Sequence, residues 1–215
     1  MERKNLTENI IVRIITYITN LILLNLLFLI FSIPIFTYGA SASALYTMTC
    51  ELKSGETEVI GGFCKAFKEQ FKQATKGWLI LMIPGIFLFV ETNLLLQIES
   101  NVPTIVYVCV IIPFVAYFCY LPWVLVQPAY FYCTQKQQFK NAMLFALQRF
   151  PQSLIMAVLQ LFPIWIFLMK TVTFIRVWPL WLFLYYSLAW SGFGMLVDRS
   201  MKKLKEVLKG KSEDK

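Results

Sequence analysis

The fold is decided by the stretch from Asn25 to Trp78, NLLFLIFSIPIFTYGASASALYTMTCELKSGETEVIGGFCKAFKEQFKQATKGW. It begins inside one apolar run, continues as a basic amphipathic segment and enters a second apolar run at Gly77. Proline removes a backbone donor and glycine permits a turn, so Pro34 and Gly39 mark the end of the first run. The stretch therefore predicts two membrane spans joined by an amphipathic segment.

The rest of the chain has the composition of a membrane protein. It is 58% hydrophobic with a mean hydropathy of +0.63, whereas ordinary soluble domains are about 45–50% apolar. A helix of about 20 apolar residues spans a hydrocarbon core of ~30 Å. The expected spans are about 21–38, 77–97, 104–126, 151–169 and 177–197. We predict a single all-α domain over residues 1–215, a polytopic membrane helical bundle with five transmembrane helices.

Amphipathic segments are expected at the membrane interface at about 58–76 and 136–150, followed by a basic tail at 199–215. In the first segment the apolar residues recur at helical spacing, and four lysines from Lys65 to Lys76 form a second stripe. Such a helix either lies along an anionic membrane surface or docks on a partner. The candidate docking surface consists of Phe63, Phe67, Phe71, Lys68 and Lys72.

The distribution of basic residues predicts the orientation. Five lysines lie between the first two spans and seven basic residues in the tail, but the loop between the second and third spans has none. Cytoplasmic loops are enriched in Lys and Arg, which favours an outside N-terminus and a cytoplasmic C-terminus in a cell membrane. Arg3, Lys4 and Arg13 near the N-terminus oppose this orientation.

The two amphipathic segments resemble each other once a gap is allowed. Pro34 matches Pro122, and the apolar positions 60, 64, 67 and 71 match 139, 143, 146 and 150. Pro84 then matches Pro163. This pattern predicts a parallel repeat of two units, each a span, an amphipathic helix and a span, closed by the fifth helix. Chance similarity between apolar segments is the alternative.

The same stretch resembles a known family. Asn25, Pro34, Thr37, Gly39 and Ala44-Leu45, followed by Phe67-Lys68 and Phe71-Lys72-Gln73-Ala74-Thr75, are similar to the signature of the YesL-like bacterial integral membrane proteins. That family has no established function, and its members are often encoded beside genes for carbohydrate uptake. The resemblance implies an accessory role near oligosaccharide transport, with sugar ABC-transporter permease subunits as partners. It supplies no catalytic residues.

A second set of residues could form a polar site inside the membrane. The candidates are Glu91, Asn93, Asn25 and Gln160. A carboxylate in a span usually faces a cavity or a partner, although Glu91 lies close enough to the end of its span for water to reach it. Amides in spans more often form helix–helix hydrogen bonds than bind ligands.

Composition excludes several function classes. The chain has no histidine, and its five cysteines show no metal-ligand spacing, so we expect no metal, cofactor or catalytic site. The charge of +8 is typical of loops that face anionic lipid, and we expect the lipid bilayer rather than nucleic acid as partner, with a homo-oligomer possible. Two functions remain: a non-enzymatic accessory or scaffold protein of carbohydrate uptake, or a small transporter or substrate-capture protein with its site between the repeats.

Overall fold

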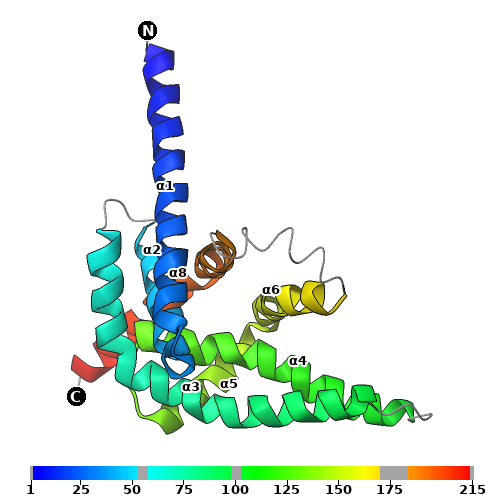
Figure 1. Cartoon of the computed structure of the whole chain (residues 1–215). Helices are drawn as coiled ribbons and strands as arrows, with labels where there is room; N and C mark the ends of the chain where they lie inside the picture. The colour runs from blue at the N-terminus through cyan, green and yellow to red at the C-terminus, as the bar shows by residue number, and fades with distance from the viewer. Residues whose placement is uncertain (1, 53–57, 98–102, 170–183, 214–215) are drawn as a thin grey trace.

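The computed structural model describes residues 2–52, 58–97, 103–169 and 184–213. Within these ranges every regular element is a helix, which confirms the predicted all-α class (Figure 1). The elements are α1 (Glu2–Ser32), η1 (Ile35–Thr37), α2 (Tyr38–Glu51), α3 (Val59–Gln97), α4 (Thr104–Val126), η2 (Gln127–Ala129), α5 (Gln135–Gln148), α6 (Phe150–Met169) and α8 (Tyr186–Glu213).

The short helix α2 lies at the centre of the fold. All its residues from Gly39 to Tyr46 are buried, and α1, α3, α4 and α8 pack against it. Small side chains make this packing close: a Cβ at Gly39 would lie 2.5 Å from the Cβ of Trp78 and 2.7 Å from the Ala74 carbonyl oxygen. Only glycine therefore fits where α2 crosses α3. The middle of the Asn25–Trp78 stretch is thus the core of the molecule.

Polar side chains of α2 are satisfied by α3. Ser43 Oγ donates to Gln70 Oε1 at 2.5 Å, and Gln70 Nε2 donates to Thr47 Oγ1 at 2.8 Å. Ser43 is fully buried and Gln70 is almost so. A buried polar group without a partner is costly, so these hydrogen bonds between α2 and α3 fix how far one helix is shifted along the other.

The first apolar helix ends earlier than the sequence predicts. α1 ends at Ser32, and its apolar span runs from Val12 to Ser32 rather than over 21–38. The residue before a proline disfavours the helical conformation, so the chain leaves the helix before Pro34. Thr37 Oγ1 then lies 2.5 Å from the Phe31 carbonyl and 2.6 Å from the Pro34 carbonyl, and so provides a donor at the end of the helix.

The amphipathic segment and the second span are one helix. α3 runs without a break from Val59 to Gln97 through Pro84, so the separate elements expected at 58–76 and 77–97 are corrected. Tyr117 of α4 donates from its hydroxyl to the Leu81 carbonyl at 3.2 Å, in the turn before this proline. Figure 1 shows the first part of α3 beside α1, and its second part extending away beside α4.

The α3–α4 hairpin (residues 79–97 and 104–122) forms one extended arm of the molecule and α1 another (Figure 1). Large apolar side chains are exposed along the hairpin, for example Ile83, Phe87 and Ile112. By length and composition three helical segments of the described residues could cross a membrane: Val12–Ser32, Val59–Leu95 and Thr104–Ala129. α5 and α6, which bend by 101° between them, would make a fourth if they are one span.

The bend between α5 and α6 is held by a buried serine. Pro151 is the second residue of α6, where its missing N–H costs little. Ser153 Oγ accepts a hydrogen bond from Trp123 Nε1 at 2.7 Å and lies 3.1 Å from the Arg149 carbonyl, to which it can donate. Trp123 is fully buried. The amphipathic segment expected at 136–150 is therefore a separate helix here, unlike its counterpart in α3.

The predicted repeat stays a prediction. One proposed counterpart, α3, is a single helix that changes direction between its two parts (Figure 1), whereas the other consists of two helices, α5 and α6, at 101° to each other. The fifth span, expected at 177–197, lies partly outside the described residues, which resume at 184. The basic tail expected at 199–215 continues α8 as a helix as far as Glu213.

Candidate functional site

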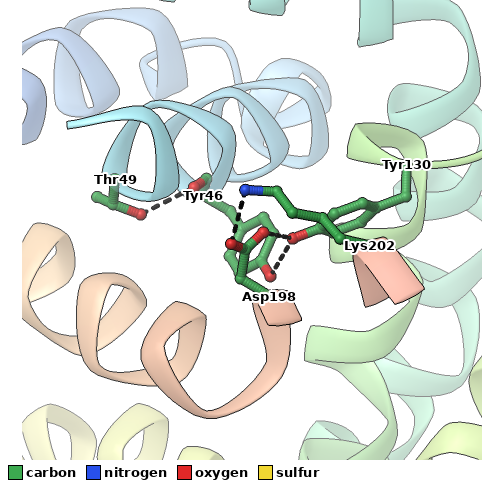
Figure 2. A network of polar contacts seen from close by, with 5 residues as sticks. All are labelled: Tyr46, Thr49, Tyr130, Asp198 and Lys202. Atoms are coloured by element: carbon green, nitrogen blue, oxygen red, sulfur yellow. Dashed lines mark hydrogen bonds and ion pairs between the residues drawn. The ribbon is translucent and has the colours of Figure 1, made fainter. Parts of the chain in front are cut away.

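A chain of hydrogen bonds joins α2, the end of η2 and α8 (Figure 2). The hydroxyls of Tyr46 and Tyr130 are 2.9 Å apart, and Tyr130 donates to Asp198 Oδ1 at 2.5 Å. Lys202 Nζ lies 2.8 Å from the other carboxylate oxygen of Asp198. Since the Tyr130 hydroxyl uses its proton on Asp198, it accepts from Tyr46. We call these four residues the tyrosine relay.

The relay runs from the surface into the core. The Lys202 side chain is 59% exposed and Asp198 18%, whereas Tyr46 is fully buried. The buried end is enclosed by the rings of Trp190 and Phe193, both within 6.4 Å of the Tyr46 ring centroid. The relay therefore connects a solvent-exposed charge with a phenol in the interior.

Burial keeps both tyrosines neutral. Desolvation, followed by the neighbouring Cys50, raises the pKa of Tyr46 far above its usual value. Desolvation also raises the pKa of Tyr130, and Tyr46 and Asp198 raise it further. The hydrogen bond to Asp198 is the main cause of a raised pKa at Lys202. At neutral pH the relay thus holds an ion pair at its outer end and two phenols inside.

This arrangement ties three segments together more readily than it catalyses a reaction. The relay spans 84 residues from Tyr46 to Tyr130 and a further 68 to Asp198. Within the described residues no group of His, Cys, Asp and Glu side chains could hold a metal ion. Its hydrogen bonds and its ion pair hold α2, the residue after η2 and α8 together.

The structure gives Asn25 a structural role. Asn25 is fully buried, and its Oδ1 accepts from the backbone nitrogen of Ser187 at 3.0 Å. Ser187 is the second residue of α8 and follows the π-helical residues 184–185, so Asn25 contacts the backbone where the helix changes its hydrogen-bond pattern. A second link between the same helices joins the Tyr17 hydroxyl to Ser191 Oγ at 2.7 Å.

The other predicted polar residues lie elsewhere. Trp78 Nε1 donates to the Ile35 carbonyl, which places this end of the hairpin beside η1. Glu91 is 13 residues further along α3, about 20 Å at 1.5 Å per residue, in the outer part of the arm. Asn93 donates to its own helix, at the Phe89 carbonyl, and Gln160 lies on α6. The structure therefore places Glu91 and Asn93 away from Asn25, whereas Gln160 follows Leu159, whose carbonyl accepts from Tyr185, two residues before Ser187.

The predicted docking surface divides into a buried and an exposed part. Phe63 is fully buried against Phe31 of α1, so its assignment to an exposed surface is corrected. Phe67 is partly buried and packs on the same ring, with centroids 4.9 Å apart. Phe71 is 36% exposed, and Lys68 and Lys72 are exposed beside it. Phe71, Lys68 and Lys72 are therefore the surface residues of this set.

Sequence reasoning missed the tyrosine relay, although it carried one signal. Asp198 is one of only two aspartates in the chain and follows an apolar run directly. An acid at the end of a span needs a partner, but the sequence does not indicate which of ten tyrosines provides it.

One family model matches part of the chain. Residues 21–92 match a family described as "Protein of unknown function, DUF624". The match covers the apolar half of α1, all of α2 and most of α3, and so contains Asn25, Gly39 and Tyr46. No curated protein and no solved structure matches the chain.

Proposed function

We propose that this YesL-like protein is a non-enzymatic accessory protein of the cell membrane that docks a partner on the exposed side of α3. YesL-like proteins belong to the matched family. The partner that the resemblance suggests is a permease subunit of a sugar ABC transporter. The positive-inside rule assigns the docking side to the cytoplasm.

The observation that carries this proposal is the change from buried to exposed side chains along one side of α3. Phe63 and Phe67 pack against α1, and Gln70 bonds to α2. One turn further on, Phe71 packs its ring on Phe67 but is 36% exposed, at the edge of this packed face, with exposed Lys68 and Lys72 beside it. A helix that is already fixed on its scaffold loses little side-chain or backbone freedom on binding, which favours docking.

The transporter alternative has less support. Its proposed site required Asn25 near Glu91, but Asn25 bonds to α8 and Glu91 lies in the outer part of the hairpin. Replacement of Glu91 by Gln in reconstituted protein still tests it, because solute uptake that depended on Glu91 would revive it.

The test of docking uses the exposed residues alone. The permease is co-purified in mild detergent with wild-type protein and with the triple variant Phe71→Ala, Lys68→Gln, Lys72→Gln. We expect recovery to fall at least tenfold, because truncation of a side chain at the centre of an interface costs about 2 kcal/mol or more, and about 1.4 kcal/mol is a tenfold change in affinity.

The matched control is Phe87→Ala with Lys136→Gln and Lys140→Gln, which removes the same side-chain types at exposed positions away from this face. Equal recovery of permease with the test variant and wild type would reject docking at this surface. Equal loss with the control variant would show that net charge, rather than this face, governs recovery.

A further inference from the structure

Three lysines from two distant parts of the sequence lie at the base of the α3–α4 hairpin. A Cβ at Gly77 of α3 would lie 3.0 Å from Nε2 of Gln138 in α5, so these two helices touch there. Lys76 is adjacent to this contact on α3. Lys136 and Lys140 lie two residues either side of Gln138, about 160° around the helix from it, and so at the same level of α5 but on its outer side, away from α3. All three side chains are exposed. We call them the lysine collar.

The position of the collar relative to the hairpin is set by the sequence. From Gly77 to Gln135 there is no Lys or Arg, so the whole arm beyond the collar lacks basic residues. Residues 78–97 of α3 measure about 30 Å at 1.5 Å per residue, which equals the thickness of a hydrocarbon core. If the arm crosses the bilayer, the collar stands at the level of the lipid headgroups.

Neighbouring contacts keep the collar in place. Gln135 Nε2 donates to the Gln73 carbonyl at 3.3 Å, and the Tyr132 hydroxyl donates to the Glu69 carbonyl at 2.6 Å. These bonds join the start of α5 to α3 beside the collar. Trp78, close to the collar in sequence, is partly exposed, and tryptophan favours the headgroup level of a membrane.

We propose that the lysine collar binds the phosphates of anionic lipid headgroups in the membrane that the hairpin crosses. Three exposed ammonium groups at this level match the charge of phosphatidylglycerol-type headgroups and have no complement in a zwitterionic lipid. This site is separate from the docking face at Phe71, Lys68 and Lys72, and does not depend on it.

The experiment measures binding of short-chain phosphatidylglycerol to the full-length protein in neutral detergent. Phosphatidylcholine of the same chain length is the lipid control, and inorganic phosphate tests the free anion. A basic residue near an anionic surface contributes about 1 kcal/mol, which is about fivefold in affinity. The variant Lys76→Gln, Lys136→Gln, Lys140→Gln is therefore expected to bind about hundredfold more weakly, and wild-type binding to weaken with added salt.

A charge-matched control is Arg13→Gln, Lys65→Gln, Lys68→Gln, which removes three exposed basic residues from α1 and the first part of α3. We expect it to bind within about threefold of wild type, because Lys65 and Lys68 are at least two turns of α3, about 12 Å, from Lys76, which exceeds a Debye length of about 8–10 Å. Unfolding followed by tryptophan fluorescence confirms that each variant is folded.

Several results would overturn the proposal. They are unchanged binding by the collar variant, equal binding of phosphatidylcholine, equal loss in the control variant, or saturation by inorganic phosphate at the same concentrations as the lipid. The last result would assign the collar to a free anion. The docking variant changes Phe71, Lys68 and Lys72 and no collar lysine, so failure of lipid binding at the collar leaves permease docking to its own test.

Discussion

The sharpest prediction concerns Gln138 and the carbonyl of Val124. The backbone remains helical through Val126 and Gln127, so the Val124 carbonyl would normally accept from the nitrogen of residue 128. Residue 128 is proline, which has no N–H. Gln138 Nε2 takes its place, 2.8 Å from the Val124 oxygen, and Gln138 is fully buried.

Replacement of Gln138 by Met keeps the volume but removes the donor. A buried carbonyl left without a partner costs about 1–3 kcal/mol. The Gln138 Oε1 has no hydrogen-bond partner among the described residues, so its removal offsets part of this loss. We therefore expect the free energy of unfolding to fall by about 1–2 kcal/mol, whereas Gln148→Met, at an exposed position of the same helix, should change it by less than about 0.5 kcal/mol.

Pro128→Ala tests the cause. Alanine restores an N–H opposite the Val124 carbonyl, so the cost of Gln138→Met should shrink by about 1 kcal/mol in that background. The assay is unfolding by SDS added to protein in mild detergent, followed by tryptophan fluorescence. An identical cost of Gln138→Met in the wild-type and the Pro128→Ala backgrounds would refute the reasoning, since it would show that the orphaned carbonyl is not what Gln138 stabilises.

Three further predictions use the same assay. Because the pKa values of Tyr46 and Tyr130 are raised in the folded protein, the unfolded chain loses these two protons first as the pH rises above 10. The free energy of unfolding should therefore fall with rising pH by up to about 1.4 kcal/mol per pH unit for each tyrosine. Tyr46→Phe should reduce this slope, and an unchanged slope would contradict the prediction. Ser153→Ala should cost about 1–3 kcal/mol, because the buried Trp123 N–H loses its acceptor; a neutral effect would argue against the serine as the support of the bend. Phe63→Ala should lower the free energy of unfolding by about 3–5 kcal/mol, because Phe63 is fully buried. Phe71→Ala should lower it by less than about 1 kcal/mol, because Phe71 is 36% exposed. Equal costs would place Phe71 in the core as well.

Hydropathy and proline positions predicted the helical elements, because both act locally. The apolar span of α1 and the two helices of the α3–α4 hairpin follow from the length of apolar runs. Helix ends follow from proline, which lacks a backbone N–H, and from glycine, which permits a turn. The sequence located the first exit within a few residues at Pro34, although the helix ends at Ser32. It could not show that α3 continues through Gly77 and Pro84, since neighbouring helices decide whether a helix survives a proline.

The central place of α2 was harder to predict. The run Gly39–Leu45 has few large apolar side chains, and so hydropathy does not mark it as the core. Its burial depends on close approach of backbones, which small residues permit and hydropathy does not measure. The tyrosine relay was beyond sequence reasoning for a related reason: its members become neighbours only after α8 has packed on α2.

Several polar side chains in the apolar segments form hydrogen bonds to backbone groups where a helix is interrupted. Pro128 orphans the Val124 carbonyl, and Gln138 supplies a donor; Pro163 orphans the Leu159 carbonyl, and Tyr185 supplies one. At the change from π-helix to α-helix before Ser187, the Asn25 side chain accepts from the Ser187 backbone nitrogen.

Where water is absent, each such group must find a partner within the protein. A polar side chain in a span of this protein therefore first has to be tested as the complement of an interrupted helix. By this criterion Asn25 belongs to the scaffold. Among the predicted residues, Glu91 on α3 and Gln160 on α6 have no such assignment, and their replacement could reveal a function rather than a fold.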